Sequence, residues 1–148
     1  MAIQQAVANS FKKELLEGEH KFQFGASGDN FKLALYVSTA TLNSATTAYT
    51  TTGEVDPSGQ YTAGGGALVK PNPSTSVASG VAIVDFADLS FTGVTITARG
   101  ALIYNTSTSD AAVAVLDFGA DKTATSGTFT IQFPNFTTSA AILRIGNA

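Results

Sequence analysis

The stretch from residue 95 to residue 133 constrains the fold of this chain most, because strand-forming runs alternate in it with turn-forming runs. Three of its segments are rich in β-branched, aromatic and small apolar residues: 95–104, 112–118 and 129–133. Small and polar residues occupy the two segments between them, 105–110 and 119–127. This alternation is typical of antiparallel strands joined by turns. The stretch therefore predicts a three-stranded meander.

Further strand candidates lie on both sides of the predicted meander. In residues 31–37, the large apolar side chains of Phe31, Leu33, Leu35 and Val37 alternate with Lys32, Ala34 and Tyr36, which predicts a strand with one buried face. Shorter β-rich runs predict additional strands at 20–24, 67–70, 77–86 and 140–145. Roughly eight or nine strands at this spacing predict a mainly β protein, an antiparallel two-sheet sandwich with a short N-terminal helix. The sequence leaves the topology open between a jelly-roll and an immunoglobulin-like (Ig-like) sandwich.

The N-terminal segment predicts a helix over residues 2–17. Four apolar side chains recur there at every fourth position and would line one helical face: Ile3, Val7, Phe11 and Leu15. Gly18 can adopt the left-handed conformation that ends a helix. These features divide the chain into a helix or arm at 1–18 and a β-sandwich domain at 19–148. A helix this short needs a surface to dock on, either its own domain or a neighbouring subunit.

The composition excludes several function classes. Charged residues make up 13% of the 148 residues, against roughly 25% in average globular proteins, and the net charge is -3. Because the chain has no basic block and no apolar run that could span a bilayer, we expect no nucleic-acid and no membrane partner. The lack of cysteine excludes disulfides and thiolate metal sites. The N-terminal segment lacks the continuous apolar core of a secretory signal, so we expect the protein to fold in the cytosol.

The single histidine does not indicate a reactive site. His20 has only Glu17 and Glu19 as acidic neighbours in the sequence. Adjacent residues of a strand point to opposite faces, so these carboxylates are not expected to converge on the imidazole ring. We therefore expect His20 to be a solvated residue at the start of a strand.

Acidic pairs and glycines also give no catalytic signal. The two closest acidic pairs in the β region lack the ligand spacing of a calcium loop: Asp85 with Asp88, and Asp117 with Asp121. Each pair lies where a predicted strand meets a turn, where aspartate commonly caps backbone amides. The three glycines at 64–66 lack the lysine and helix of a phosphate loop, so they predict a bulge or a strand entry. We expect no enzyme activity, no catalytic residue, no metal or cofactor, and no small-molecule substrate.

Arg99 is an isolated cation within an apolar run. It stands among threonine, alanine and glycine, and Asp117 lies on the neighbouring predicted strand. A half-buried guanidinium needs an anionic partner, so we expect a structural ion pair between Arg99 and Asp117. A contact between Arg99 and another subunit is the alternative.

Several segments follow one another in an order that is similar to that of a known family. They are FKKELLEG, FKLALYVSTATL, YTTTGEVDPSGQYTAGGGAL, VDFADLSFTGVTITARGALIYN, AVAVLDFGADKTATSGTFTIQF and ILRIG. As a set, they resemble small structural proteins encoded by tailed bacteriophages, over nearly the whole chain. Pro57 and Ser58 lengthen the turn between Val55 and Gly59 relative to the pattern of that family. The resemblance implies a component of the phage particle.

A neutral, threonine-rich sandwich with a short helix suits a capsid decoration, or cement, protein, whose affinity comes from contact area rather than charge. The expected partner is the major capsid protein, whose neighbouring subunits such a protein clamps, and the expected assembly is a homo-oligomer, with a trimer favoured. The expected location is the virion, after assembly in the bacterial host cytoplasm. The residues predicted to make these contacts are Ile3, Val7, Phe11, Leu15, Tyr49 and Tyr61. The alternatives are a tail or head–tail joining component and a glycan-binding fibre module, the latter disfavoured by the lack of tryptophan.

Overall fold

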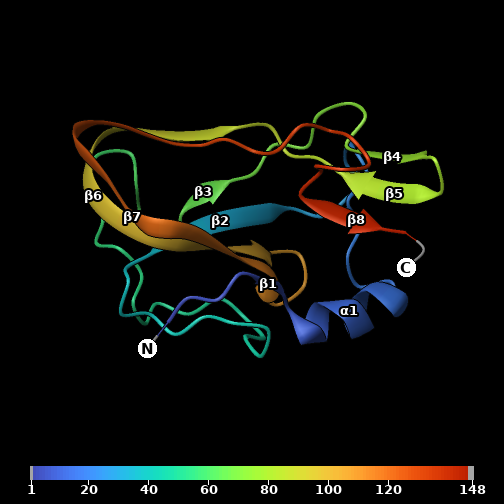
Figure 1. The fold of residues 1–148 in the computed structure, drawn as a ribbon, viewed down its shortest axis with the longest axis horizontal. Helices are drawn as coiled ribbons and strands as arrows, with labels where there is room; N and C mark the ends of the chain where they lie inside the picture. Colours follow the sequence, from blue (N-terminus) through green and yellow to red (C-terminus); the bar gives the residue numbers. More distant parts are fainter. Residues whose placement is uncertain (1, 147–148) are drawn as a thin grey trace.

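The computed structural model describes residues 2–146, which form a mainly β protein with two antiparallel sheets and one short helix (Figure 1). The strands of the larger sheet are Ala6–Val7 (β1), Phe31–Tyr36 (β2), Gly66–Ala67 (β3), Leu89–Asn105 (β6) and Ala111–Ile131 (β7). Those of the smaller sheet are Thr75–Ala78 (β4), Val81–Val84 (β5) and Leu143–Ile145 (β8). The strand orders are β1-β7-β6-β2-β3 and β4-β5-β8. This sandwich-like arrangement confirms the predicted fold class.

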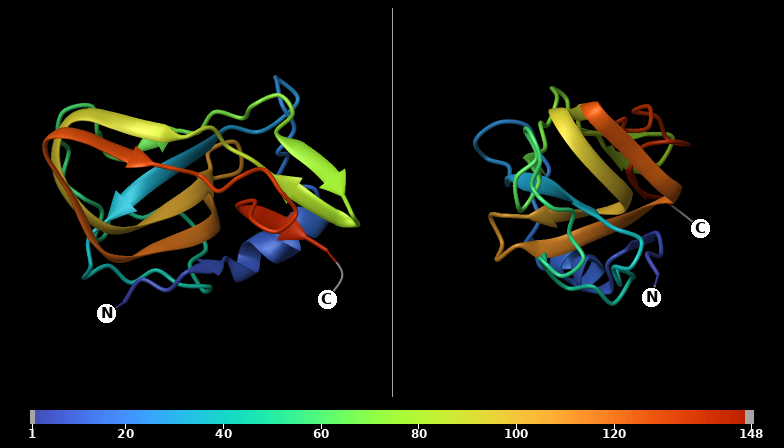
Figure 2. Two further views of the ribbon diagram at one scale, coloured as in Figure 1. Left: turned by 45° about the horizontal axis from the view of Figure 1, so that its top comes forward. Right: turned by 90° about the vertical axis from the view of Figure 1, so that its left-hand side faces the viewer.

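Strands β6 and β7 form one long antiparallel ribbon, and the larger sheet curls with it (Figures 1 and 2). The pairing runs from Leu89 opposite Ile131 to Asn105 opposite Ala111, and its register shifts at four places. Irregularities of this kind bend strands and increase their twist, which accounts for the curl. The turn predicted at 105–110 joins the two strands and is confirmed.

The turn predicted at 119–127 is wrong, because these residues continue β7 opposite β6. The predicted meander of three strands is therefore a ribbon of two. Most side chains of this segment are exposed, so the strand can form without the apolar face by which a strand is recognised in a sequence. Backbone pairing and hydroxyl contacts across the ribbon stabilise it instead, as where Oγ1 of Thr97 and Oγ1 of Thr123 lie 2.8 Å apart.

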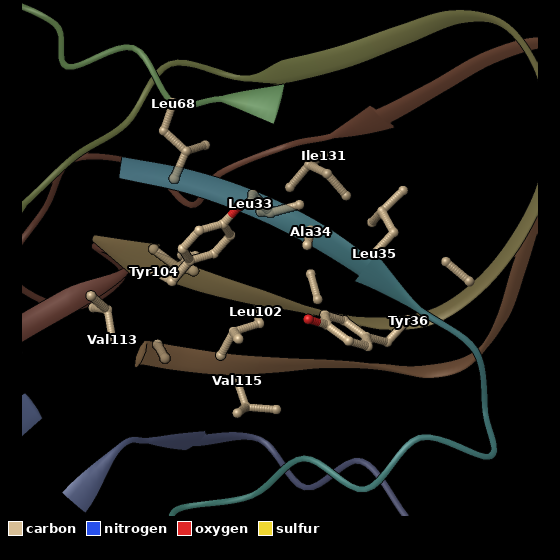
Figure 3. Packing of buried hydrophobic residues seen from close by; sticks show 14 of the residues in the cluster. Leu33, Ala34, Leu35, Tyr36, Leu68, Leu102, Tyr104, Val113, Val115 and Ile131 are labelled. Atoms are coloured by element: carbon tan, nitrogen blue, oxygen red, sulfur yellow. The ribbon is translucent and has the colours of Figure 1, made fainter. Parts of the chain in front are cut away.

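Strand β2 lies inside the larger sheet, between β6 and β3, and is buried on both faces. Figure 3 shows side chains from β2, β6 and β7 gathered in the main core, among them Leu33, Leu102 and Val115. The neighbouring Tyr36 is also fully buried, and its hydroxyl donates to the carbonyl oxygen of Thr50 at 2.6 Å. The sequence predicted one buried face only, because it did not show that the loop after β2 packs against Tyr36.

The single strand predicted at 77–86 is a hairpin made of β4 and β5. Residues 75–78 pair with residues 81–84, which leaves a two-residue turn between them. Ser79 and Gly80 occupy this turn with φ values of 50° and 75°. Positive φ at both central residues is what the commonest tight hairpin turn requires.

Helix α1 spans Asn9–Leu16 and is shorter than the helix predicted at 2–17. Val7 precedes it in β1, and Ile3 forms an isolated bridge with Leu42 in the loop after β2. The four apolar residues spaced by four therefore do not share one helical face, because the first two lie in extended chain.

Helix α1 packs on its own chain. At its start, the amide of Ala8 donates to the carbonyl oxygen of Val113 in β7 at 3.0 Å. Phe11 is buried, with its ring centroid 5.9 Å from that of Phe22. Phe22 lies in an irregular segment, so the strand predicted at 20–24 is absent.

The three glycines at 64–66 lead into β3, which is shorter than the strand predicted at 67–70. Gly65 has a φ of 75°, and a Cβ on it would overlap the carbonyl oxygen of Leu33 in β2. Gly119 has a similar φ of 78°, but a Cβ there would meet nothing within 4 Å. Gly65 is therefore constrained both by its own conformation and by the close approach of β2.

Alanine substitutions at these two glycines separate the two constraints. Gly119→Ala should lower the free energy of unfolding by about 1 kcal/mol, which is the cost of left-handed backbone for a residue with a Cβ. Gly65→Ala should lower it by roughly 3 kcal/mol or more, because β2 must also move away. Chemical denaturation measures both values, and equal losses would contradict the close approach.

Candidate functional site

A groove of about 990 Å³ lies between α1 and the smaller sheet. Residues of β1 and α1 form one side, and residues of β4, β5 and β8 form the other. In Figure 1, β8 lies between β5 and α1, and the left view of Figure 2 shows the same order. Most of the lining is apolar, including Val7, Phe11, Leu15, Leu16, Val77, Ile83 and Leu143.

Three large aliphatic side chains in this lining are open to solvent. Leu16 is 91% exposed, Val77 71% and Ile145 60%. Within residues 2–146, the other exposed large hydrophobic side chains are Phe24 and Val69, and both lie outside the lining. Soluble proteins rarely gather exposed apolar side chains in one place unless the place is an interaction site. The groove is therefore the candidate contact surface.

Of the residues that the structure describes, Lys12 and Arg144 are the charged ones in the groove lining, and none of these lining residues carries a carboxylate. Nζ of Lys12 donates to Oδ1 of Asn9 at 3.2 Å. Nη1 of Arg144 donates to the carbonyl oxygens of Thr138 and Ser139, at 3.3 and 2.9 Å. Within the described part of the chain, neither cation forms an ion pair. The groove is therefore apolar with local positive charge.

Three of the six residues predicted to make contacts line the groove: Val7, Phe11 and Leu15. Ile3 and Tyr61 are instead buried within the protein, and Tyr49 is half-buried. Ile3 and Tyr61 are buried outside the groove lining, so the structure corrects them to core residues, whereas Phe11 is buried but lines the groove. The sequence missed the sheet side of the groove, because the hairpin of β4 and β5 was interpreted as one strand.

Glu54 connects two tyrosines to the glycine loop. Its Oε2 accepts a hydrogen bond from the hydroxyl of Tyr49 at 2.6 Å. Its Oε1 accepts from the hydroxyl of Tyr61 and the amide of Gly64, both at 2.7 Å. The hydroxyl of Tyr104 donates to the carbonyl oxygen of Gly64 at 2.6 Å, and its ring stacks on that of Tyr49. The network fixes the chain between β2 and β3 to the sheet.

The environment of this network raises the pKa of every tyrosine in the chain. Burial raises the pKa of Tyr104 to about 12, and nearby carboxylates add to the effect. Burial is also the largest cause for Tyr36, Tyr49 and Tyr61. Donation to Glu54 raises the pKa of Tyr49 and Tyr61 further, because a phenolate would face the carboxylate without a proton to share.

His20 is buried, which corrects the prediction that it is solvated. Its Nε2 lies 2.8 Å from Oε2 of Glu14, and its Nδ1 lies 3.0 Å from Nδ2 of Asn105. Nδ2 of Asn105 also donates to Oδ2 of Asp29, and its Oδ1 accepts from the amide of Ser107. Because the amide nitrogen is a donor, Nδ1 of His20 must accept, and Nε2 donates to Glu14. These bonds connect α1 to the end of β6, across a separation in sequence that local patterns do not reveal.

The ion pair predicted between Arg99 and Asp117 is present, with Nε 2.9 Å from Oδ1. The hydrogen bond from Arg99 is the main cause that lowers the pKa of Asp117, and a bond from the Gly119 amide adds to it. This carboxylate therefore favours the folded state above about pH 4, and the contribution is lost as the pH falls. Both side chains are partly exposed, so the pair is a minor contributor to stability.

Two of the four aspartates predicted to cap backbone amides, Asp88 and Asp117, do so. Oδ1 of Asp88 accepts from the amide of Phe133 at 2.8 Å, and Oδ1 of Asp117 accepts from that of Gly119 at 2.9 Å. Among residues 2–146, no group of three or more histidine, cysteine, aspartate or glutamate side chains is arranged to hold a metal ion. None of the helical segments that the structure describes is long and apolar enough to cross a membrane.

Comparison of this chain with protein-family models, with curated proteins and with solved structures found no match. A functional proposal therefore stands on the geometry of the groove and on the resemblance of the sequence to phage structural proteins.

The raised pKa values of the tyrosines predict a sharp response to alkali. Neutral tyrosines stabilise the fold fully below about pH 10, their pKa in the unfolded chain, and this contribution is lost as the pH rises further. Tyrosinate absorbance should therefore appear only together with the loss of circular dichroism, above about pH 11. The protein unfolded in urea is the control and should titrate near pH 10. Ionisation near that pH in the folded protein, with unchanged dichroism, would contradict the network.

Proposed function

We propose that this chain is a structural protein of a tailed-phage particle, and specifically a capsid decoration protein. The observation that carries the binding role is the groove between α1 and the smaller sheet, with Leu16, Val77 and Ile145 exposed in it. The phage context comes from the resemblance of the sequence. In this role the protein clamps neighbouring subunits of the major capsid protein and acts as an oligomer, with a trimer favoured.

The groove supports a binding role through the hydrophobic effect. Apolar surface removed from water contributes about 25 cal/mol per Å² to association, and three aliphatic side chains are available for it here. Charged groups are sparse in the chain as a whole, so contact area rather than ion pairing supplies the affinity. A decoration protein attaches to a particle that is already assembled, and such binding can rely on contact area of this kind.

Two observations support a contact role over the other function classes. Carbohydrate modules stack sugars on exposed aromatic rings, and among residues 2–146 the one exposed aromatic side chain is Phe24, outside the groove. The polar clusters around Glu54 and His20 are bonded internally and lie within the protein. We therefore propose a non-enzymatic protein that binds other proteins.

Copy number separates a decoration protein from a tail or joining component. A decoration protein occupies repeated capsid positions, on the order of hundreds per particle, whereas a joining protein forms one ring of about six or twelve. Quantitative mass spectrometry of purified particles measures this ratio. A ring-like copy number would replace the decoration proposal with the joining component.

Aspartate substitutions at two exposed valines test the binding role. Val77→Asp places a charge in the groove and should weaken binding to particles that lack this protein by about tenfold or more. Val69→Asp is the matched control, because Val69 is 63% exposed but lies outside the groove, and binding should change by less than about twofold. Co-sedimentation with the particles measures binding, and thermal unfolding confirms that both variants fold.

Two outcomes of that experiment contradict the proposal. Wild-type protein that does not bind the particles rules out a decoration role. Equal binding by the two variants shows that contacts are made elsewhere on the protein.

A further inference from the structure

We propose that the groove between α1 and the smaller sheet binds a segment of another protein that is apolar and carries carboxylates. This inference rests on the proposed function for the identity of the particle, and it adds the chemistry of the partner. It follows from the charge of the groove, from the unused hydrogen-bond donors of its two cations, and from the free strands at its side.

The charge of the groove is opposite to that of the whole chain. The chain has a net charge of -3, yet among residues 2–146 the groove lining contains two cations and no carboxylate. The nearby carboxylates lie outside the groove lining: Glu14 accepts a hydrogen bond from His20, and the adjacent Glu17 forms an ion pair with Lys13 at 2.8 Å. An acidic occupant would therefore meet the two cations of the lining directly, whereas a basic occupant would be repelled by them.

Both cations have donors to spare for a carboxylate. An ammonium group has three donors, and Lys12 uses one of them on Asn9. A guanidinium has five, and Arg144 directs Nη1 toward two backbone carbonyl oxygens. These bonds hold Arg144 in place, and within residues 2–146 its other nitrogen donors have no partner, so a two-point bond to a carboxylate is possible.

The sheet side of the groove suits an extended segment. β4 and β8 are the outer strands of the smaller sheet within residues 2–146, so each has one edge without a strand beside it. The exposed Val77 belongs to β4, and Ile145 belongs to β8. β8 lies on the side of α1 (Figure 1), so a segment that alternates apolar and acidic residues can bond its free edge, cover the aliphatic side chains and reach the two cations.

Defined peptides test this chemistry directly. The probe is a fluorescein-labelled peptide of about ten residues that alternates leucine with glutamate, and its control alternates leucine with lysine. Fluorescence anisotropy at neutral pH should show binding of the acidic peptide about tenfold or more tightly than of the basic one. Lys12→Glu and Arg144→Glu should each weaken the acidic peptide by about fivefold or more.

Lys122→Glu is the matched control. It changes the net charge by the same amount on the exposed part of β7, outside the groove lining, and should alter binding by less than about twofold. Equal affinity for the two peptides, no binding of the acidic peptide at about 1 mM, or equal effects of Lys12→Glu and Lys122→Glu would each overturn the inference. A wild-type protein that self-associates in sedimentation equilibrium, and that Val77→Asp renders monomeric, would also overturn it, with a second copy as the occupant.

Particle binding separates this inference from the proposed function. Particles that bind Lys12→Glu and Arg144→Glu as well as they bind the wild-type protein overturn the acidic partner and leave the decoration role intact. Wild-type protein that binds the acidic peptide but not the particles supports the chemistry of the groove and removes the decoration role.

Discussion

The pairing of β6 with β7 is the interaction on which the rest of the structure depends. β2 pairs with β6 and β1 pairs with β7, so β3 alone in the larger sheet has no direct bond to this ribbon. The ribbon also positions the helix, because the amide of Ala8 bonds Val113 in β7 and the His20 network ends on Asn105 of β6. The register of these two strands therefore determines the position of α1, which forms one side of the groove.

The polar groups inside the protein differ from those in the groove. Glu54 receives three hydrogen bonds from the chain itself, and His20 has a partner on each ring nitrogen. In the groove, Lys12 and Arg144 keep donors that no other residue of 2–146 uses, and aliphatic side chains such as Leu16 remain in water. A buried polar group without a partner is costly, and within residues 2–146 Oγ of Ser10 is the one buried side-chain polar atom that lacks a hydrogen bond. In the described part of the chain, the groove therefore holds hydrogen-bond donors and aliphatic side chains that remain available to bind another molecule.

Local patterns in the sequence predicted those features that depend on neighbours in the chain. The run at 31–37 predicted β2, and the turn residues at 105–110 predicted the turn between β6 and β7. The Arg99–Asp117 pair was found because the two residues lie on adjacent strands around that same turn. Where the partner in space is also close in topology, sequence reasoning is sufficient.

The incorrect predictions concern features that depend on residues distant in the sequence or on weak local signals. Residues 119–127 look like a turn because exposed strand pairs need no apolar face, and only the pairing with β6 makes them a strand. The burial of His20 depends on Asn105, far along the chain. The Ser79–Gly80 pair was a usable sign of a hairpin, and it would have placed the smaller sheet and its side of the groove. The groove itself joins the two ends of the chain, which no local pattern shows.

We propose that the protein binds its particle through the groove between α1 and the smaller sheet. Hydrogen–deuterium exchange of the free and the particle-bound protein tests it most directly. If the groove is the contact surface, exchange in α1, β4 and β8 should slow on binding, and exchange in the exposed part of the ribbon at 119–127 should stay unchanged. Slower exchange confined to that ribbon, with α1, β4 and β8 unchanged, would contradict it.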